Sequence, residues 1–432
     1  MSKTSNTPAN PFFVQTIIPD EYFCDRKEDT DRIITMLRDG NNIVLTSPRR
    51  IGKSSLLHHI LLQKEIRRTY NTLYVDIQNT QSAADFIMAM KKALRDPATS
   101  TFPDAFRGEF ETVTREYGIH SGFTAGPVSL QADYRERQQR KDEDVLVEVF
   151  RLLGRTAKPN LVIFDEFQQI EKYPDNITAL LRANIQLLSN SRFIYSGSSV
   201  HMLASMFTQY NHPFYNSSMP YGLKRIPSQV YADFCREMFR KRGRMITGEA
   251  CSLIYDLFLG NTLNMQQVMN RVFQDTAVGD TADRQEAEEA IRTILQDRSD
   301  LYEAAFSSLK STGERRVVAC IANEGVAEGM TSTTMLARYG LGAPSSVSNH
   351  LKALSGEERK VITRTGNTWR LADRFFELWI LWQAGTLTAR FEEAQAVRLR
   401  YERARRAALP TKTVLRETQP EATTTKKRGP KP

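Results

Sequence analysis

The stretch IVLTSPRRIGKSSLL, residues 43–57, decides how the rest of the chain is interpreted. Its first residues are apolar and mostly β-branched, which predicts a buried strand, and the following SSLLHHILLQ predicts a helix. A Gly-Lys-Ser between a strand and a helix is the pattern of a phosphate-binding loop, although Ser47 stands where the usual pattern has its first glycine. On its own, the stretch is either a nucleotide site or a chance Gly-Lys-Ser in a basic turn.

In a phosphate-binding loop each residue type has its own task. Backbone N–H groups and the helix N-terminus would hold the phosphates, which Gly52 would let the backbone approach closely. Lys53 would contact the β- and γ-phosphates, and Ser54 would bind Mg²⁺. The candidate nucleotide-binding residues of the loop are Ser47, Pro48, Arg49, Arg50, Ile51, Gly52, Lys53, Ser54 and Ser55.

A second motif lies about 110 residues further on, where the apolar run NLVIFDEF ends in Asp165 and Glu166. In a parallel sheet both carboxylates would lie at the carboxyl edge, beside the loop. Asp165 would then hold Mg²⁺, and Glu166 would polarise the attacking water. A surface acidic pair at a strand end is the alternative, but the presence of both motifs favours a site for ATP and Mg²⁺.

Polar residues also follow the next predicted strand, in RFIYSGSS at residues 192–199. Ser198 is the first candidate and Ser196 the second for a residue that senses the γ-phosphate. Ordinary turn chemistry explains the same residues equally well, so both interpretations stay open.

Four short runs rich in β-branched or aromatic residues alternate with helical stretches, which is typical of a parallel sheet with crossover helices. These runs are residues 42–47, 72–78, 161–167 and 192–198, and residues 221–226 are a candidate fifth strand. Residues 97–140, rich in Gly, Pro, Thr and charge, are expected to form an insertion of unknown role, with a candidate hairpin at 121–134.

From residue 227 onward helices replace the strand pattern, and residues 227–300 predict a small helical domain. Residues 301–385 contain three predicted helices and two strands around a Gly-Asn turn, which is the winged-helix pattern. The third helix, 345–354, is the usual DNA-reading element, although protein docking or self-inhibition is the alternative for this domain. Its polar residues are Ser345, Ser346, Ser348, Asn349, His350 and Lys352, and Arg364 and Arg370 lie on the predicted wing.

As a set, PDEYFCDRKED, SPRRIGKSSLL, IFDEFQQIEKYPDN, FIYSGSSVHMLASMF and RLADRFFELW resemble a prokaryotic AAA+-type ATPase family, related to the archaeal ATPases and to STAND-class switch NTPases. The resemblance covers residues 11–382. It implies an α/β P-loop NTPase core with a parallel sheet, then a helical lid and a winged-helix domain, as in origin-recognition initiators. It also implies that Ser47 is a variant which this family tolerates.

The resemblance further implies that Phe23 and Arg26 pack near the adenine, although packing of this turn on the sheet is equally open. The lid of related ATPases often has a Gly-x-Pro turn. Here Gly260 is followed by Asn and Thr, so no sensor arginine is assigned in the lid. The role of Arg49 and Arg50, toward phosphate, lid or neighbouring chain, stays open, and Arg182 is a candidate contact to a neighbouring subunit.

Composition narrows the class of protein. The chain has 432 residues, of which 41% are hydrophobic and 25% charged, as in ordinary globular domains. The N-terminus lacks an apolar signal region, no apolar run is long enough to span a bilayer, and the four cysteines form no CxxC pair. We therefore expect a cytoplasmic protein with no membrane partner and no structural zinc.

The charge is concentrated near the C-terminus. The net charge is +9, and residues 388–432 hold twelve Lys and Arg against five Asp and Glu. We expect residues 386–432 to form a basic, partly disordered tail that includes a basic helical stretch at 391–410. Such a tail suggests an anionic partner, nucleic acid first. A solubilising end is the alternative. The final RGPK resembles a minor-groove AT-hook only poorly.

Together these patterns predict a leader at 1–18, a P-loop core at 19–226, a lid at 227–300, a winged helix at 301–385 and the tail. The leading hypothesis is a Mg²⁺-dependent ATPase in which ATP clamps the lid and repositions the winged helix, with Lys53, Glu166 and Ser198 as catalytic residues. The alternatives are a DNA-binding regulator or defence factor with ATP as a structural ligand, and a protein-interaction switch without nucleic acid. A protein partner and a homo-oligomer are further candidates.

Overall fold

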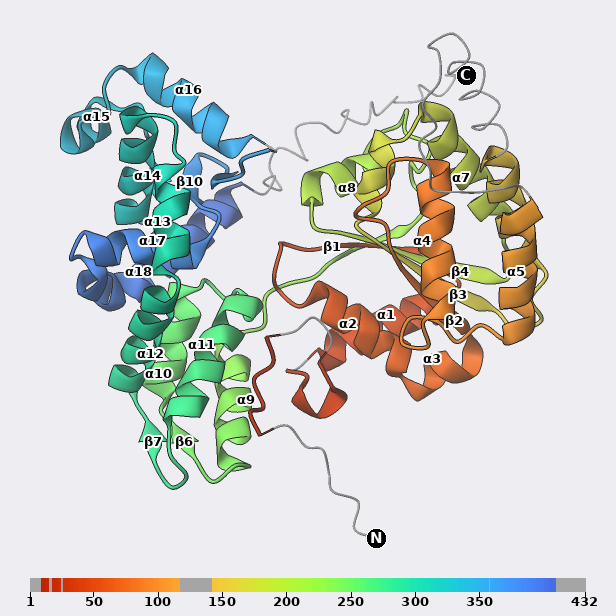
Figure 1. Cartoon of the computed structure of the whole chain (residues 1–432), viewed down its shortest axis with the longest axis horizontal. Coiled ribbons are helices and arrows are strands. Elements are labelled where there is room, and N and C mark those ends of the chain that lie inside the picture. Colours follow the sequence, from red (N-terminus) through yellow and green to blue (C-terminus); the bar gives the residue numbers. More distant parts are fainter. Residues whose placement is uncertain (1–8, 15–17, 25, 117–141, 357, 409–432) are drawn as a thin grey trace, which may run out of the picture. The chain divides into compact units, whose positions relative to one another are not determined.

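The computed structural model describes residues 9–14, 18–24, 26–116, 142–356 and 358–408. The chain divides into two compact units, each of which is considered by itself. The sheet unit spans Phe13–Tyr231, and the helical unit joins Met1–Phe12 to Ala232–Pro432 (Figure 1). Among the described residues, no helix has the length and apolar character needed to cross a membrane.

The sheet unit is built on five parallel strands in the order β2-β3-β4-β1-β5. The strands are β1 (Ile43–Thr46), β2 (Asn71–Asp76), β3 (Asn160–Asp165), β4 (Ser191–Gly197) and β5 (Met219–Gly222). In the register, Asp76 pairs with Asp165 and Thr46 pairs with Gly197. The carboxyl ends of the central strands therefore meet at one edge, as the sequence predicts.

The predicted position of the fifth strand, residues 221–226, is wrong. Strand β5 pairs Met219 to Gly222 with the four residues of β1, and the ladder ends where β1 ends. Leu223 and Ile226 are buried beyond the ladder. The apolar residues that suggested a strand therefore belong to a packed connection.

Alternate strand residues face opposite sides of the sheet, so Ile43 and Leu45 belong to one hydrophobic core and Val44 to the other. Helices cover both sides and make a three-layer α/β fold (Figure 1). One face carries α1 (Lys27–Arg38), α2 (Lys53–Leu62) and α3 (Lys64–Thr69). The other carries α4 (Ala83–Arg95), α5 (Asp104–Glu116), the helix at residues 142–154, α7 (Asp175–Leu187) and α8 (Val200–Thr208). Two short 3₁₀ helices are η1 (Asp20–Tyr22) and η2 (Phe167–Lys172).

The first part of the expected insertion at residues 97–140 contains a helix that the sequence analysis did not predict. Helix α5 contributes Phe106 and Phe110 to the core, and Phe102 precedes them at the same spacing. Phe106 and Phe110 are four residues apart and so lie on one face of α5. Because Gly, Thr and charged residues lie between the phenylalanines, the helical spacing was not recognised in the sequence. The predicted hairpin at 121–134 lies outside the described residues.

The first part of the helical unit contains the helices predicted for the lid. They are α9 (Ser228–Arg240), which begins at the end of the sheet unit, α10 (Gly248–Leu257), α11 (Thr262–Asp275) and α12 (Arg284–Asp297), with the short pair β6 (Met245–Ile246) and β7 (Thr281–Ala282). Phe12 is fully buried among Phe234, Phe239 and Phe273. The end of the expected leader is therefore anchored in this helical bundle.

The winged helix follows, and it contains the three predicted helices and the predicted hairpin, flanked by one further helix on each side and joined by a third, short strand. Its elements are α13 (Ser299–Ser307), α14 (Thr312–Glu324), β8 (Ala327–Glu328), α15 (Thr333–Tyr339), α16 (Pro344–Ser355), β9 (Ile362–Thr365), β10 (Thr368–Leu371) and α17 (Arg374–Gln383). The strands form a sheet in the order β8-β10-β9. Gly366 has φ +57° in the predicted hairpin turn, and the Ser332 hydroxyl accepts a hydrogen bond from the Met335 N–H at the start of α15.

The helical stretch expected at residues 391–410 is present as the long helix α18 (Leu387–Ala407), but it is packed into the helical unit rather than forming part of a tail. One face of α18 is buried and carries Phe391, Ala394, Val397 and Tyr401 at helical spacing. Helix α18 packs against α10 and α17. The prediction relied on charge and overlooked this apolar face. Residues 409–432 lie outside the described part of the chain.

Candidate functional site

The loop between β1 and α2 makes a tight turn with two residues in the left-handed region. Arg50 and Gly52 have φ values of 64° and 87°, and Gly52 caps the N-terminus of α2. A Cβ on Gly52 would meet no atom within 4 Å, so the left-handed φ rather than crowding favours glycine. Ser47 is buried, and its hydroxyl donates to the Pro48 carbonyl at 3.2 Å.

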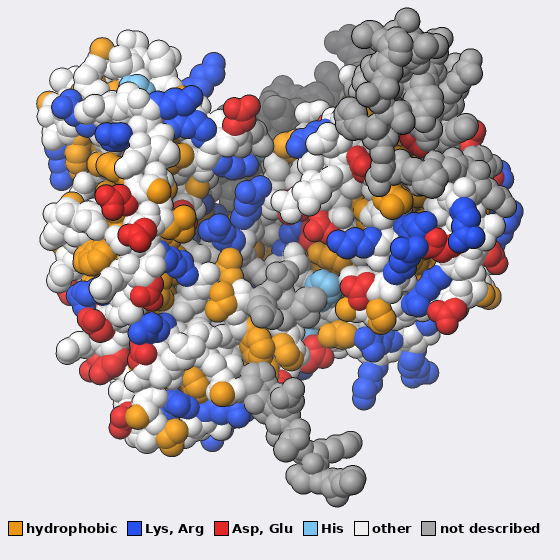
Figure 2. All heavy atoms as spheres, in the orientation of Figure 1, with side chains coloured by type: hydrophobic (Ala, Val, Ile, Leu, Met, Phe, Trp, Pro, Cys, Tyr) orange, Lys and Arg blue, Asp and Glu red, His pale blue; other side chains and the backbone are white. Residues whose placement is uncertain are grey.

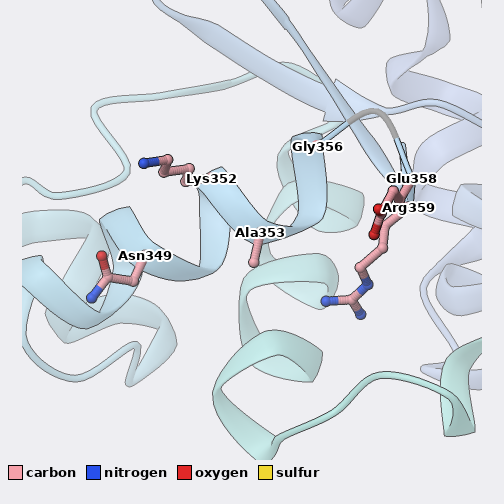
Figure 3. Close-up of a pocket in the computed structure, with 6 residues that line it drawn as sticks. All are labelled: Asn349, Lys352, Ala353, Gly356, Glu358 and Arg359. Atoms are coloured by element: carbon pink, nitrogen blue, oxygen red, sulfur yellow. The ribbon is translucent and has the colours of Figure 1, made fainter. Parts of the chain in front are cut away.

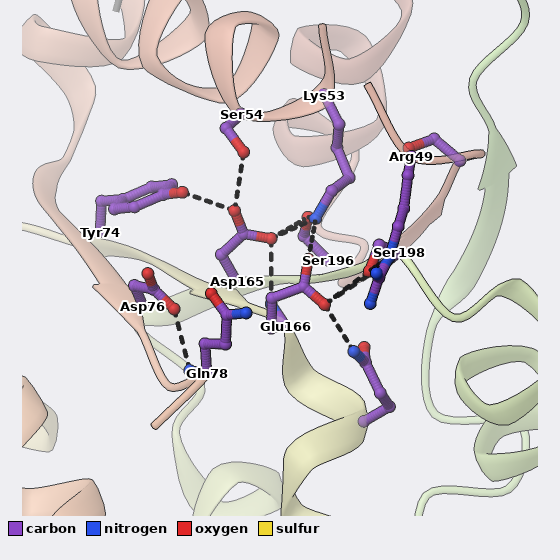
Figure 4. A network of polar contacts seen from close by, with 12 residues as sticks. Arg49, Lys53, Ser54, Tyr74, Asp76, Gln78, Asp165, Glu166, Ser196 and Ser198 are labelled. Atoms are coloured by element: carbon purple, nitrogen blue, oxygen red, sulfur yellow. Dashed lines mark hydrogen bonds and ion pairs between the residues drawn. The ribbon is translucent and has the colours of Figure 1, made fainter. Parts of the chain in front are cut away.

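Asp165 is the centre of a polar cluster that joins the loop to the sheet (Figure 4). Its Oδ1 contacts the Lys53 ammonium and accepts from the Ser196 hydroxyl at 2.8 Å and from the Glu166 N–H at 3.0 Å. Its Oδ2 accepts from the Ser54 hydroxyl at 3.0 Å and from the Tyr74 hydroxyl at 2.5 Å. Five donors from four segments of the chain therefore fix this one carboxylate.

The pKa of Asp165 reflects two opposing effects. Burial is the largest and would raise the pKa of the carboxyl, because it disfavours the charged form. The Lys53 ammonium and the hydrogen bonds from Lys53, Tyr74 and Ser196 outweigh burial and lower the pKa to about 2. Asp165 is therefore ionised at neutral pH and able to bind a cation.

Lys53 and Ser54 are the first two residues of α2 and point from the helix toward the end of β3. The Lys53 ammonium also donates to the Ser196 hydroxyl at 2.7 Å and lies 3.7 Å from Oε1 of Glu166. All its acidic partners are at the sheet edge. Lys53 thus reaches across the loop in the way expected of a residue that contacts phosphate.

Glu166 is held mainly through one oxygen. Its Oε2 accepts from the Ser198 hydroxyl at 2.9 Å, from the Ser198 N–H at 3.4 Å and from the Gln168 amide at 2.5 Å. The Ser198 hydroxyl in turn accepts from Nε of Arg49 at 3.3 Å. A chain of contacts therefore runs from the loop through Arg49 and Ser198 to Glu166.

The other predicted residues lie around this cluster. Arg26 donates to the carbonyls of Ile51 and Lys224 at 2.9 and 2.7 Å, and so braces the loop from behind. Phe23 stacks on His59 of α2 at 4.4 Å. These contacts describe packing on the sheet unit, which was the alternative to an adenine contact. Arg182 of α7 is not part of this cluster in the described structure.

Tyr74 and Gln168 are members of the cluster that the sequence analysis did not identify. Tyr74 lies inside β2, and its alternation with Val75 places it on the side of the sheet that α2 covers. That alternation was a usable signal for Tyr74. Gln168 lies in η2, and the sequence offers no signal for the direction of a side chain in such a turn.

The cluster offers a divalent cation two oxygen ligands, the Ser54 hydroxyl and the Asp165 carboxylate. Oxygen is the donor that Mg²⁺ prefers, and Mg²⁺ commonly uses one or two protein ligands together with phosphate and water. Within the described ranges, no group of three or more His, Cys, Asp or Glu residues could hold a metal by itself. The donor set therefore fits a magnesium ion bound with a nucleotide.

Helix α16 of the winged helix presents a polar surface. Along α16, Ser345, Ser346, Ser348, Asn349 and Lys352 are exposed, and Val347, Leu351 and Leu354 are buried. Figure 2 shows scattered Lys and Arg side chains over the part of the helical unit that carries α16. His350 packs against Gly313 of α14, where a Cβ would lie 2.5 Å from its ring.

A pocket of about 440 Å³ lies at the C-terminal end of α16 (Figure 3). It is lined by Asn349, Lys352, Ala353, Gly356, Glu358 and Arg359. Arg359 binds both carboxylate oxygens of Glu314, at 2.7 and 2.8 Å. On the wing, Arg364 lies over the Trp369 ring and Arg370 over the Tyr401 ring. The arginines of this region therefore already have partners within the domain.

Comparisons with known proteins agree with this architecture. Residues 300–382 match the model of a probable winged helix domain. A Walker-type ATPase of Pyrococcus abyssi has a similar structure, with TM-score 0.52, 18% identity and 86% of this chain and 99% of that chain covered. The ORC2 protein of Aeropyrum pernix, solved in ADPNP and ADP complexes, has TM-score 0.50 and 14% identity, and the match covers 87% of this chain and 98% of that one. A search of curated proteins found no match.

At these identities the structural likeness establishes the fold. Together with the parallel sheet and the winged-helix match, it shows that the chain has the α/β P-loop fold of these two structures and a winged helix at residues 300–382.

Proposed function

We propose that the chain binds ATP with Mg²⁺ and hydrolyses it at the cluster around Asp165. The observation that carries this proposal is the meeting of Lys53, Ser54 and Asp165 at one sheet edge, behind a loop that begins a helix. Lys53 would contact the β- and γ-phosphates, and Ser54 with Asp165 would hold Mg²⁺. Apart from Pro48, which has no N–H, the candidate loop residues Ser47 to Ser55 would supply backbone N–H groups to the phosphates. The bound Mg²⁺ would neutralise developing charge on the phosphates.

Glu166 is the proposed base for hydrolysis. A water oxygen would bond to the γ-phosphorus, and the bond from that phosphorus to the β–γ bridging oxygen would break. Glu166 would accept the proton of the water, and ADP and inorganic phosphate would leave. The hydrogen bonds of Ser198 with Glu166 and Arg49 support the proposal that Ser198 senses the γ-phosphate.

Hydrolysis is tested by comparing the full chain with Glu166→Gln. We expect the variant to bind MgATP with unchanged affinity and to hydrolyse it at least about 100-fold more slowly, because the amide cannot accept the proton. The Asn323→Ala variant, which changes an exposed residue of the winged helix, is the control. Equal hydrolysis rates for Glu166→Gln and the wild type would overturn the assignment.

The proposed output is movement of the lid and the winged helix as one body. Arg374 donates to the Leu257 carbonyl of α10 at 2.8 and 3.0 Å, and Arg390 donates to the Ala322 and Asn323 carbonyls at 3.0 and 2.7 Å. Glu377 pairs with both arginines, and all three side chains are at most 3% exposed. A lid that responds to nucleotide would therefore carry the winged helix with it.

Duplex DNA is a second candidate ligand, favoured by the exposed polar face of α16. Residues 409–432 add six Lys and Arg against two Glu, and α18 ends just before them. A truncation after residue 408 removes these charges and leaves α18 complete. We expect anisotropy to show duplex binding at about 50 mM salt that weakens steeply by about 200 mM, and we expect it to weaken in the truncated chain and in Lys352→Ala. No binding at the lower salt would exclude DNA.

A further inference from the structure

We infer that Gln168 is the residue that positions the Glu166 carboxylate for hydrolysis, and that Gly197 is a glycine in order to make room for it. This inference rests on the proposed ATPase activity and adds a positioning residue to it. Gln168 is in η2, two residues after Glu166, and its side-chain amide donates to Oε2 of Glu166 at 2.5 Å.

The burial of Gln168 is unfavourable for stability. The residue is 8% exposed, and its carbonyl oxygen Oε1 is fully buried without a hydrogen-bond partner among the described residues. An unpaired buried acceptor loses its hydrogen bonds to water and receives nothing in return. A reversed amide would bring this oxygen against the Glu166 carboxylate, so the donor must face Glu166. The Gln168 side chain therefore donates a hydrogen bond to Glu166 while its own carbonyl oxygen stays without one.

Gly197 provides the space that the carbonyl occupies. A Cβ on Gly197 would lie 2.0 Å from Oε1 of Gln168 and 3.2 Å from its amide carbon. A distance near 2.0 Å is far inside van der Waals contact, so any side chain at residue 197 would displace the amide. Gly197 is the last residue of β4 and has ordinary strand geometry, with no positive φ. Contact with Gln168, rather than backbone conformation, therefore explains the glycine.

The contacts of Glu166 indicate what the amide achieves. Oε2 accepts from Gln168 and from the hydroxyl and N–H of Ser198. Among the described residues, Oε1 has only the long 3.7 Å contact with the Lys53 ammonium. One oxygen is thus fixed by three donors, and the other stays available on the side of the phosphate-binding lysine. Glu166 also has a left-handed φ of 58°, which a non-glycine residue adopts only when its surroundings impose it.

The test compares Gln168→Met with Gln169→Met in the full chain. Methionine has a similar length but neither donor nor acceptor. Gln169 lies next in η2, is half-buried, and its side chain has no hydrogen-bond partner in the described structure. We expect Gln168→Met to bind MgATP within about twofold of wild type and to lower kcat about tenfold or more. We expect its Tm to be unchanged or higher, because an unpaired buried oxygen is removed. Gln169→Met should change neither kcat nor affinity.

The variant Gly197→Ala should also displace the Gln168 amide from Glu166, because the added Cβ would clash with Oε1 of Gln168. We expect it to lower kcat to a similar degree and to retain MgATP binding. The inference is overturned if wild type hydrolyses ATP and Gln168→Met does so at the same rate. It is also overturned if Gln168→Met loses Tm, affinity and kcat in parallel, which is the signature of a structural residue. If the wild type neither binds nor hydrolyses MgATP, the proposed function itself fails. That result differs from the two outcomes for Gln168→Met that would overturn the inference.

Discussion

The chain contains two buried ionic clusters that differ in how their charges are held. In the helical unit, Glu377 lies between Arg374 and Arg390, and these arginines are tied to backbone carbonyls of α10 and α14. In the sheet unit, the Lys53 ammonium has side-chain partners only, namely Asp165, Ser196 and Glu166. Partners on backbone carbonyls are fixed by the fold, whereas side-chain partners can be exchanged.

The difference shows how similar ion pairs serve different purposes. The Glu377 cluster is at most 3% exposed, which suits a permanent connection between lid and winged helix. Glu166 in the Asp165 cluster keeps 20% of its side chain exposed, next to a loop that begins a helix. The first cluster therefore stabilises one arrangement, and the second is suited to release Lys53 and Ser54 to a nucleotide.

The largest expected effect comes from breaking the permanent cluster. We expect Glu377→Ala to lower the free energy of unfolding of the helical unit by about 3–5 kcal/mol, because two buried arginines lose their counter-charge. Urea unfolding of the full chain, followed by tryptophan fluorescence and circular dichroism, measures it. The control Glu392→Ala breaks the exposed pair with Arg284 and should cost no more than about 1 kcal/mol. A loss below about 1 kcal/mol for Glu377→Ala would refute the comparison.

A smaller effect is expected from the pH dependence of the Asp165 cluster. The pKa of Asp165 is lowered from 3.8 to about 2, so its ionised form stabilises the folded state by about 2 kcal/mol above pH 4. This contribution is lost as the pH falls from about 4 to 2, through the folded pKa.

The variant Lys53→Met tests whether the Lys53 ammonium causes the low pKa of Asp165 and hence the pH dependence of stability. Without the ammonium, burial opposes the ionised form of Asp165 against fewer lowering contacts, so the gain in stability as the pH rises from about 2 to 4 should shrink or reverse. Unfolding free energies from pH 2 to 7 measure the change. Lys92→Met, at an exposed lysine of α4, should keep the wild-type profile. Identical profiles for Lys53→Met and wild type would show that Lys53 does not control Asp165.

The smallest expected effect on stability is at Gly52. We expect Gly52→Ala to cost about 1 kcal/mol, since φ is 87° and no atom lies within 4 Å of the added Cβ. MgATP binding should nevertheless weaken by at least about tenfold, because the backbone could no longer approach the phosphates closely. In contrast, Gly108→Ala in α5 has no positive φ and should leave binding unchanged. Retained affinity in Gly52→Ala would argue against a phosphate at this loop.

The sequence predicted those features whose chemistry limits the choice of residue. A phosphate-binding loop needs Gly-Lys-Ser before a helix, and an acidic pair must end a buried strand, so Lys53 and Asp165 were recognisable from order and spacing. The hairpin turn at Gly366 was recognisable for the same reason. Features that depend on tertiary contacts were not recognisable from the sequence. Gln168 acts through a 3₁₀ turn, and the charges of α18 concealed an apolar face.

Equilibrium binding of MgATP to the wild-type chain and to Lys53→Ala tests the central claim most directly. In this account the Lys53 ammonium leaves the Asp165 carboxylate and contacts the phosphates when MgATP binds. Lys53 should therefore contribute a large share of the binding free energy for MgATP. We therefore expect the wild type to bind MgATP at least about 100-fold more tightly than Lys53→Ala, which corresponds to about 3 kcal/mol. Equal affinities would show that the nucleotide, if bound, does not use this cluster.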